Sequence, residues 1–308
     1  MTDTAPWTPD GLSTRLAGDR TVVWASPHVA ARVAARWSFP HVQALDAVPP
    51  HAEWVVVVGG GTRIDAAKLW RYDTGRRIGL VAVPSLWGSG AEVSPVAVGP
   101  GVTKRIVVDP TLVPEARVLW PELADSVPAE RVRWACGDAW AHAVEGFLSP
   151  LADDAVRADG AALLARLLAL PLDRDARWFE ASAAACALQA RASVGLVHGL
   201  AHVLEPRLAA VGDPRADHAR LCATLLDPVL AFDLAQSPKA AAHFARYGVD
   251  LEAVLAIAAA LRDDETLRAL RPHVDAVWPD VVRDRCTRTN AASVRASSRD
   301  ALLAGWPA

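Results

Sequence analysis

Five side chains that can bind a metal ion or carry a proton recur at helical spacing in the second half of the chain. Asp138 and His142 stand four residues apart, and His198 and His202 repeat that interval. Residues four apart lie on one face of a helix, so each pair presents two donors in one direction. His218 follows in another helix-like segment. These five residues are therefore candidate ligands or proton carriers.

The chemical types of these side chains indicate which ion they would bind. One carboxylate and several imidazoles suit a borderline divalent ion such as Fe²⁺ or Zn²⁺, whereas Mg²⁺ and Ca²⁺ prefer oxygen donors. Such an ion acts as a Lewis acid on an alcohol or carbonyl oxygen and so assists hydride transfer. Taken singly, each histidine is better explained as a hydrogen-bonded core or surface residue. The matched spacing favours a metal site.

A glycine turn in the first half of the chain has the features of a phosphate-binding loop. The apolar run 54–58 ends in Gly59, Gly60, Gly61 and Thr62, and a helix-like segment follows. Glycine lets the backbone approach an anion closely, and the start of a helix attracts phosphate. A tight turn that only joins a strand to a helix explains three glycines equally well. The expected ligand is a pyrophosphate group.

A second loop of small and hydroxyl-bearing residues follows the apolar run 79–83. It contains Ser85 and Ser89 in the segment PSLWGSGAE. Open α/β sheets bind ligands beyond the carboxyl ends of their strands, so both serines are candidates to face a cofactor. The alternative is an ordinary connection in which Trp87 serves packing.

The elements that would position these groups change in kind along the chain. Up to about Ser126, short β-branched runs alternate with helix-length segments, which predicts an open, mostly parallel sheet. The expected strands cover residues 21–24, 54–58, 79–83 and 105–108. Beyond Val127, alanine and leucine at helical spacing predict an all-helical half. We therefore expect an α/β domain at residues 1–126 and a helical domain at residues 127–308.

The bulk properties of the chain narrow the classes of partner. Its 308 residues are 52% hydrophobic, which is enough for a large packed core. The net charge of -3 and the scattered basic residues argue against a nucleic-acid partner and favour a small-molecule substrate. The first eleven residues lack a secretory signal, and charged residues interrupt the most apolar stretch, 181–211. We expect no membrane span and a cytoplasmic location.

The cysteines suggest no special chemistry. Cys136, Cys186, Cys222 and Cys286 lie far apart without a CxxC pair. This spacing indicates neither a zinc ribbon nor a disulfide framework. We expect all four to be reduced, buried and inert.

Four motifs, taken in order, resemble those of the iron-containing alcohol dehydrogenase family. The family patterns are GGGSxxDxAK, PTxxGTGSE, DAxxHAxE, and a helix carrying HxxxH with a later histidine. The matching stretches are GGGTRIDAAK from Gly59, PSLWGSGAE from Pro84, DAWAHAVE from Asp138 and HGLAH from His198. The resemblance runs from about residue 22 to residue 230. It implies an α/β dinucleotide-binding domain followed by an all-α domain, a fold shared with dehydroquinate synthase.

The resemblance also implies roles for individual residues. It makes four residues the metal ligands, namely Asp138, His142, His198 and His218, with His202 as a proton relay beside them. It assigns pyrophosphate binding to Gly59, Gly60, Gly61 and Thr62, and the nicotinamide side to Ser85, Ser89 and Lys104. The implied cofactors are NAD(H) or NADP(H), with Fe²⁺ or Zn²⁺. Asp65 and Lys68 match the first motif either as cofactor contacts or as structural residues of the helix.

Four departures from the family pattern carry expectations of their own. Ser26 stands where an acidic residue usually follows the early strand, which leaves NAD or NADP open and is closer to the maleylacetate reductase branch. The segment from Ser26 to Gly59 is short and an initial strand region is missing, so we expect dinucleotide affinity to be weakened or lost. The interval from His198 to His218 is long, with DHA in place of the family's PHG. Abbreviation after Ala231 is expected to open or reshape the substrate pocket.

The sequence therefore predicts a metal-dependent, NAD(P)-linked alcohol dehydrogenase or carbonyl reductase that acts on a small alcohol, aldehyde or ketone. The active site is expected in the cleft between the two domains. Two alternatives stay open: a lyase or cyclase of the dehydroquinate synthase type, and a non-redox metal-binding or partner-stabilising protein that has lost dinucleotide affinity. The oligomeric state is open too, with a homodimer as one alternative.

Overall fold

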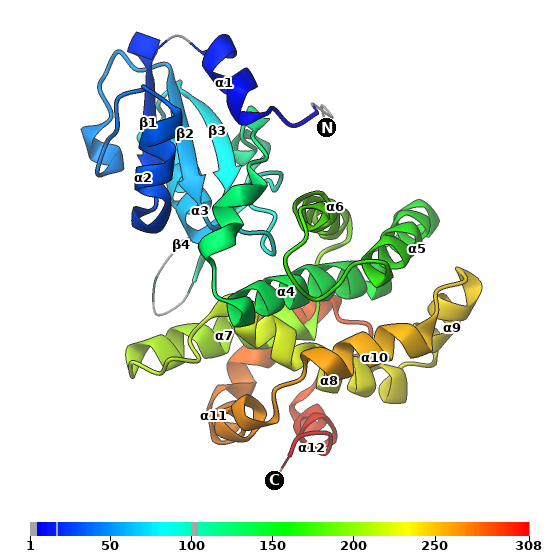
Figure 1. Cartoon of the computed structure of the whole chain (residues 1–308). Helices are drawn as coiled ribbons and strands as arrows, with labels where there is room; N and C mark the ends of the chain where they lie inside the picture. Colours follow the sequence, from blue (N-terminus) through cyan, green and yellow to red (C-terminus); the bar gives the residue numbers. More distant parts are fainter. Residues whose placement is uncertain (1–4, 17, 100, 102–103, 308) are drawn as a thin grey trace. The chain divides into compact units, whose positions relative to one another are not determined.

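A computed structural model of the chain describes residues 5–16, 18–99, 101 and 104–307. The chain forms two compact units, one of Met1–Pro100 with Arg105–Val127 and one of Gly101–Lys104 with Pro128–Ala308. The first, the α/β unit, contains strands and helices, and the second, the helical unit, contains the long helices (Figure 1). This confirms the predicted class of an α/β half followed by an all-α half.

A four-stranded parallel sheet forms the centre of the α/β unit. Its strands lie in the order β1 (Thr21–Ala25), β2 (Trp54–Gly59), β3 (Gly79–Pro84) and β6 (Ala116–Arg117). Helix α1 (Pro9–Arg15) precedes β1, α2 (Pro27–Arg36) follows β1, and α3 (Gly61–Thr74) joins β2 to β3. The carboxyl ends of β1, β2 and β3 therefore meet at one edge of the sheet, where the glycine turn lies.

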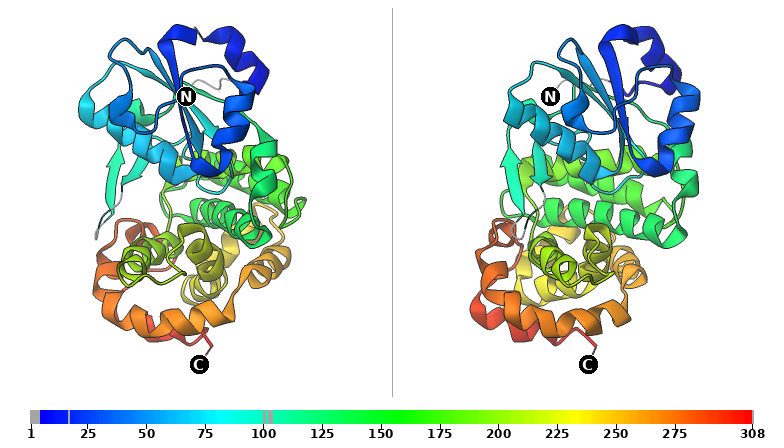
Figure 2. Two further views of the ribbon diagram at one scale, coloured as in Figure 1. Left: turned by 60° about the vertical axis from the view of Figure 1, so that its left-hand side comes forward. Right: turned by 90° about the vertical axis from the view of Figure 1, so that its left-hand side faces the viewer.

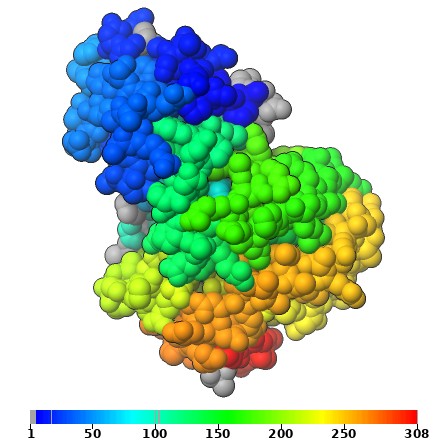
Figure 3. Space-filling model, in the orientation of Figure 1, coloured from blue at the N-terminus to red at the C-terminus, as the bar shows by residue number. Residues whose placement is uncertain are grey.

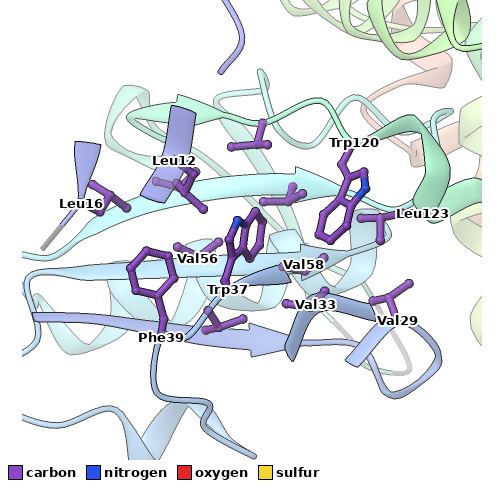
Figure 4. Packing of buried hydrophobic residues seen from close by; sticks show 14 of the residues in the cluster. Leu12, Leu16, Val29, Val33, Trp37, Phe39, Val56, Val58, Trp120 and Leu123 are labelled. Atoms are coloured by element: carbon purple, nitrogen blue, oxygen red, sulfur yellow. The ribbon is translucent and has the colours of Figure 1, made fainter. Parts of the chain in front are cut away.

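Both faces of this sheet are buried, as expected for a parallel sheet covered by helices. Val56 and Val58 of β2 face a cluster around Trp37, which Figure 4 shows at close range. Val57 of the same strand faces a second cluster that includes Ile64 of α3. Helices α2 and α3 thus cover opposite faces of the sheet, as the views in Figure 2 show.

The predicted strands are present, but one of them pairs differently from the prediction. The segment 105–108 forms β5 (Arg105–Val108), which pairs antiparallel with β4 (Val96–Gly99) in a separate two-stranded sheet. Its side chains are exposed or half-buried, so it lacks the two apolar faces that a parallel strand needs. The place in the parallel sheet belongs to β6, a two-residue strand that no β-branched run predicts.

Helix α4 (Ala129–Leu148) forms the centre of the helical unit and packs against α6 (Arg177–Ala192) and α8 (His218–Gln236) (Figure 2). A Cβ at Gly137 would lie 2.3 Å from the Cβ of Ala223, so glycine permits the close approach of α4 and α8. The other helices are α5 (Asp154–Leu168), α7 (Leu196–Ala210), α9 (Pro238–Arg246), α10 (Leu251–Leu261), α11 (Asp264–Arg283) and α12 (Arg299–Leu303).

The later helices cover α8 and form an outer face of the helical unit. In the space-filling view, the orange atoms of α10 and α11 and the red atoms of α12 lie together on this face (Figure 3). Within the described part of the chain, no helix is both long enough and apolar enough to cross a membrane.

Candidate functional site

Helix α4 contributes two of the predicted ligands from one buried face. Oδ1 of Asp138 lies 3.8 Å from Nδ1 of His142, as the spacing of four residues predicts. Every residue of α4 from Ala135 to Leu148 is buried. A charged carboxylate in such surroundings requires compensating partners.

The other two predicted ligands stand at helix starts. His198 lies in the first turn of α7, with Nε2 3.6 Å from Oδ1 of Asp138. His218 is the first residue of α8, where the Asp217 carboxylate caps the helix by accepting a backbone N–H. The long interval between these histidines is occupied by the rest of α7 and the connection 211–217. The ring centroids of His142 and His218 lie 4.4 Å and 5.6 Å from that of His198, so the structure brings all four residues together.

A carboxylate orients each of the two histidines on α7 and α8. Nδ1 of His198 lies 2.6 Å from Oε2 of Glu145, and Nδ1 of His218 lies 3.2 Å from Oε2 of Glu205. Such a partner fixes the tautomer and the ring orientation of a metal-binding histidine and leaves Nε2 available. Neither glutamate was predicted as a partner of these histidines, although Glu145 follows Asp138 by seven residues and so shares its helix face.

Two buried polar atoms at the centre of this cluster lack a hydrogen-bond partner among the described residues. They are Oδ1 of Asp138 and Nε2 of His198, on side chains that are each only 2% exposed. Leaving a buried polar atom unsatisfied costs about 1–3 kcal/mol. A divalent cation would satisfy both atoms at once, and a carboxylate with several imidazoles is a donor set that Fe²⁺ and Zn²⁺ accept. The residues therefore fit a metal ion.

Burial lowers the pKa of His198 and of His218, but Cys222 and the neighbouring carboxylates outweigh burial and raise both, so a bound ion must displace a proton from each ring. The shifts of Asp138 and His202 agree with metal binding and proton transfer. Burial alone would raise the pKa of Asp138, but the surrounding histidines outweigh burial and hold its pKa below the ordinary value. For His202, burial lowers the pKa well below the ordinary value, and the neighbouring histidines and Lys104 lower it further. Asp138 thus stays charged and able to bind a cation, whereas His202 stays neutral and able to accept a proton.

Cys222 is free and buried as predicted, and it lies beside the predicted ligands. It follows His218 by one helical turn, and its Sγ lies 3.6 Å from Nε2 of His218. Asp138, His198, His218 and Cys222 each offer one donor atom, and these atoms all lie within 4.8 Å of one another. The interval of four residues from His218 would have drawn attention to this thiol. All four cysteines of the chain are free.

His202 lies beside this group, one turn after His198. Its ring is stacked on that of His218, with centroids 5.4 Å apart and an angle of 12° between the planes. Nδ1 of His202 lies 3.7 Å from Sγ of Cys286, and Asp284 completes a second set of donors within 4.8 Å. Cys286 is only half-buried, so the prediction that all four cysteines are buried is wrong for this one. The proton-relay role of His202 remains a prediction.

Lys104 groups with the helical unit. Its Nζ donates a hydrogen bond to Oε2 of Glu205, the carboxylate that also holds His218. Lys104 therefore contacts the same carboxylate that orients His218. Its predicted contact with a nicotinamide ring remains a prediction.

The glycine turn is tightly packed at two positions and open at the third. A Cβ at Gly59 would lie 2.4 Å from Oγ of Ser26, and one at Gly61 would lie 2.2 Å from Oγ of Ser89. A Cβ at Gly60 would meet no atom within 4 Å. Because α3 begins at Gly61, this open position leads to the start of a helix, where an anion is favoured.

A pocket of about 340 Å³ adjoins the open glycine. It is lined by Trp24, Ser26, Gly60, Thr62, Arg63 and Ala66, so two of the predicted cofactor residues and the early-strand serine border it. Of the loop serines, Ser85 is buried after β3 and its backbone N–H donates to the carbonyl of Gly59, while Ser89 packs against Gly61. The α/β unit thus has a hollow where a dinucleotide is expected.

The structure gives Asp65 and Lys68 structural roles. The Lys68 side chain is fully buried, and its Nζ donates to the carbonyl oxygens of Ala91 and Val96. Its Nζ also lies 3.3 Å from Oδ1 of Asp65, whose Oδ2 accepts the backbone N–H of Val98. These bonds tie α3 to the loop after β3 and to β4.

A buried polar network supports the start of α7. Oδ1 of Asn290 accepts the backbone N–H of Leu196, and its Nδ2 donates to Oδ1 of Asp233. Two glycines make room for this segment, since a Cβ at Gly195 would lie 2.6 Å from Oδ1 of Asn290 and one at Gly199 would lie 2.0 Å from Oγ1 of Thr287. The C-terminal segment is therefore in direct contact with the helix that carries His198.

Asp233 makes stability in this network depend on pH. Burial raises the pKa of Asp233 to about 7, even though Asn290 and Ala292 donate to it. The unfolded chain releases this proton near the ordinary pKa of 3.8, so stability falls as pH rises from about 4 to about 7. Asp233→Asn abolishes this loss and is expected to increase the free energy of unfolding relative to wild type by on the order of a few kcal/mol at pH 8 and by less at pH 5, with the melting temperature as the measurement. Equal destabilisation at both pH values would show that the native carboxyl is ionised.

Part of the chain is similar in sequence to known enzymes. No family model matches the chain. It is 31% identical over 208 residues to 1-propanol dehydrogenase PduQ of Salmonella typhimurium, which covers 62% of this chain and 54% of the relative. It is 27% identical over 204 residues to the maleylacetate reductase of Pseudomonas knackmussii, which covers 61% and 54%. The matches thus span about half the length of these curated relatives.

Solved structures resemble the chain over nearly its whole length. Iron-containing alcohol dehydrogenase from Thermococcus thioreducens gives a TM-score of 0.76 at 20% identity, over 97% of this chain and 96% of that one. Sulfoacetaldehyde reductase from Bifidobacterium kashiwanohense, solved in complex with NAD⁺, gives 0.71 at 18% identity, over 92% and 90%. At these identities the likeness concerns the fold.

Proposed function

Because its homologues and structural neighbours are iron-containing alcohol dehydrogenases, we propose that this chain is a metal-dependent, nicotinamide-linked alcohol dehydrogenase or carbonyl reductase. The proposed substrates are small alcohols, aldehydes or ketones. The convergence of Asp138, His142, His198 and His218 carries the proposal, since four residues from three helices meet around two buried atoms that lack hydrogen-bond partners.

In the proposed reaction, Asp138 and the three histidines hold the ion, and Glu145 keeps the His198 ring in place. When bound, Fe²⁺ or Zn²⁺ would supply Lewis-acid polarisation of the substrate oxygen, and a nicotinamide would supply the hydride chemistry. His202 accepts the proton that an alcohol loses and returns it during carbonyl reduction, because burial keeps its imidazole neutral.

We propose NADP(H) as the preferred cofactor. Among the described residues that line the pocket beside Gly60 there is no acidic side chain to accept hydrogen bonds from the ribose hydroxyls of NAD. Ser26 and Arg63 border the pocket instead, and the Arg63 guanidinium lies over the ring of Trp24 at 4.0 Å. A guanidinium suits the extra phosphate of NADP.

Titration with NADPH and NADH tests the cofactor proposal, with quenching of the 12 tryptophans as the readout. We expect NADPH to bind more tightly than NADH. We expect Gly60→Leu to weaken NADPH binding at least about 10-fold, or 1.4 kcal/mol, because Gly60 lines the pocket that the new side chain would enter. The melting temperature should not fall, because a Cβ at this position meets no protein atom within 4 Å.

Gly18→Leu is the matched control, since a Cβ at Gly18 also faces open space and Gly18 does not line the pocket. Unchanged NADPH affinity in Gly60→Leu would refute this binding position. If wild-type protein binds neither dinucleotide, the non-redox alternative replaces the oxidoreductase proposal.

A further inference from the structure

The group of four donors in the helical unit contains a sulfur atom. Asp138, His198, His218 and Cys222 supply one donor atom each, and His142 lies outside this mutually close group. Cys222 is fully buried on α8, so its thiol is shielded from solvent. Among the four cysteines, Cys222 alone lies in this group, within the part of the chain that the structure describes.

Two distances within the group match those between ligands of one small ion. Donor atoms 2.0–2.3 Å from a tetrahedral zinc ion lie about 3.3–3.8 Å from one another. Nε2 of His198 lies 3.6 Å from Oδ1 of Asp138, and Sγ of Cys222 lies 3.6 Å from Nε2 of His218. The carboxylates of Glu145 and Glu205 occupy Nδ1 of the two histidines, so Nε2 is the atom that each ring presents.

We propose that Cys222 is a direct ligand of the bound metal ion and that the site therefore takes Zn²⁺ in preference to Fe²⁺. Thiolate, imidazole and carboxylate together are a set that zinc binds in four-coordinate sites, and a thiolate shifts selection towards softer ions. The thiol releases its proton to solvent on binding. This inference rests on the metal site of the proposed function and places Cys222 there in place of His142 as the fourth ligand. It requires neither a nucleotide nor a substrate.

Two other arrangements compete with this one. Cys222 is also within hydrogen-bond distance of His218, so the thiol can serve only to orient that ring. Separately, Cys286 lies in the second donor set with His202 and Asp284, where a thiolate would bind an ion at a different place. Each arrangement predicts a different dependence of the metal spectrum on the two cysteines.

Cobalt substitution distinguishes these arrangements. Full-length protein is stripped with a chelator, reloaded with Co²⁺, and examined for the near-ultraviolet charge-transfer band that a cobalt–thiolate bond produces. We expect the band in wild type and in Cys286→Ser, and its loss in Cys222→Ser. Zinc affinity, measured by chelator competition, is expected to fall at least about 100-fold in Cys222→Ser, since even outer partners of ligands contribute 10–100-fold. The zinc-to-iron ratio of the purified protein should fall as well.

A wild-type protein without the band overturns the proposal, whether or not Cys222→Ser folds. A band that persists in Cys222→Ser and disappears in Cys286→Ser also overturns it and assigns the sulfur to the second donor set. Titration of the same samples with NADPH and NADH distinguishes failure of this inference from failure of the proposed function. A cobalt–thiolate band without binding of either dinucleotide sustains the inference and refutes the oxidoreductase, whereas dinucleotide binding and alcohol oxidation without the band refute the inference alone.

Discussion

Purified His198→Ala protein is expected to retain less than about a tenth of the wild-type metal content and to oxidise alcohols at least about 1000-fold more slowly, equivalent to about 4 kcal/mol of activation free energy. His198 lies at the centre of the site, between Asp138 and Glu145. Its removal deletes one metal donor and takes one partner from each of two buried carboxylates. Metal analysis and steady-state kinetics provide the measurements.

Two further variants make this result specific. Glu145→Gln keeps the His198 ring in place less firmly, so a 10–100-fold loss of metal affinity is expected in place of complete loss. His51→Ala, on an exposed histidine of the α/β unit, should leave both metal content and rate unchanged. Full metal occupancy in His198→Ala would refute the ligand assignment.

Lys68→Met is expected to destabilise the α/β unit by about 3–5 kcal/mol, the largest effect on stability that we predict. Methionine fills a similar volume, but it removes the donor to the carbonyls of Ala91 and Val96 and leaves the Asp65 carboxylate without its cation. Denaturant unfolding, followed by tryptophan fluorescence, measures this change.

The matched control for Lys68→Met is an ion pair of the same unit at the surface. Arg105 and Asp73 pair at 2.7 Å with about half of each side chain exposed, so Arg105→Met should leave the free energy of unfolding nearly unchanged. A loss of similar size in both variants would contradict the structural role of Lys68. A double variant with Asp65→Asn should be less destabilised than the sum of the single changes, because the two residues interact.

The sequence predicts the features of this fold that depend on neighbouring residues, but not those that depend on contacts between distant segments. The parallel strands are predictable because Val55–Val58 form an uninterrupted apolar run, and the metal-binding helices because Asp138 and His142 share one face. β5 is assigned to the wrong sheet, since a run of β-branched residues does not reveal its pairing partner. Local sequence patterns determine which segments become strands or helices, whereas contacts between distant segments determine which strands pair.

The same limit explains what was missed at the site. Cys222 and His218 are separated by one turn, but nothing local indicates that α8 faces Asp138 of α4. Glu205 becomes a partner of His218 only because the connection after α7 reverses the chain. Burial raises the pKa of Asp233, and its hydrogen-bond partner Asn290 comes from 57 residues later in the chain. Residue types supply the candidates, and the tertiary fold selects among them.

Two glycines at the start of α7, Gly195 and Gly199, limit where the chain can change length. We expect extra residues to be tolerated in the connection between α7 and α8, which leads into a helix capped by Asp217. Gly195 and Gly199 give no such freedom, since the side chains of Asn290 and Thr287 occupy the space where a Cβ would be. A stop codon before Thr287 would consequently remove these contacts from the start of α7 and disturb the predicted ligand His198, almost ninety residues earlier in the sequence.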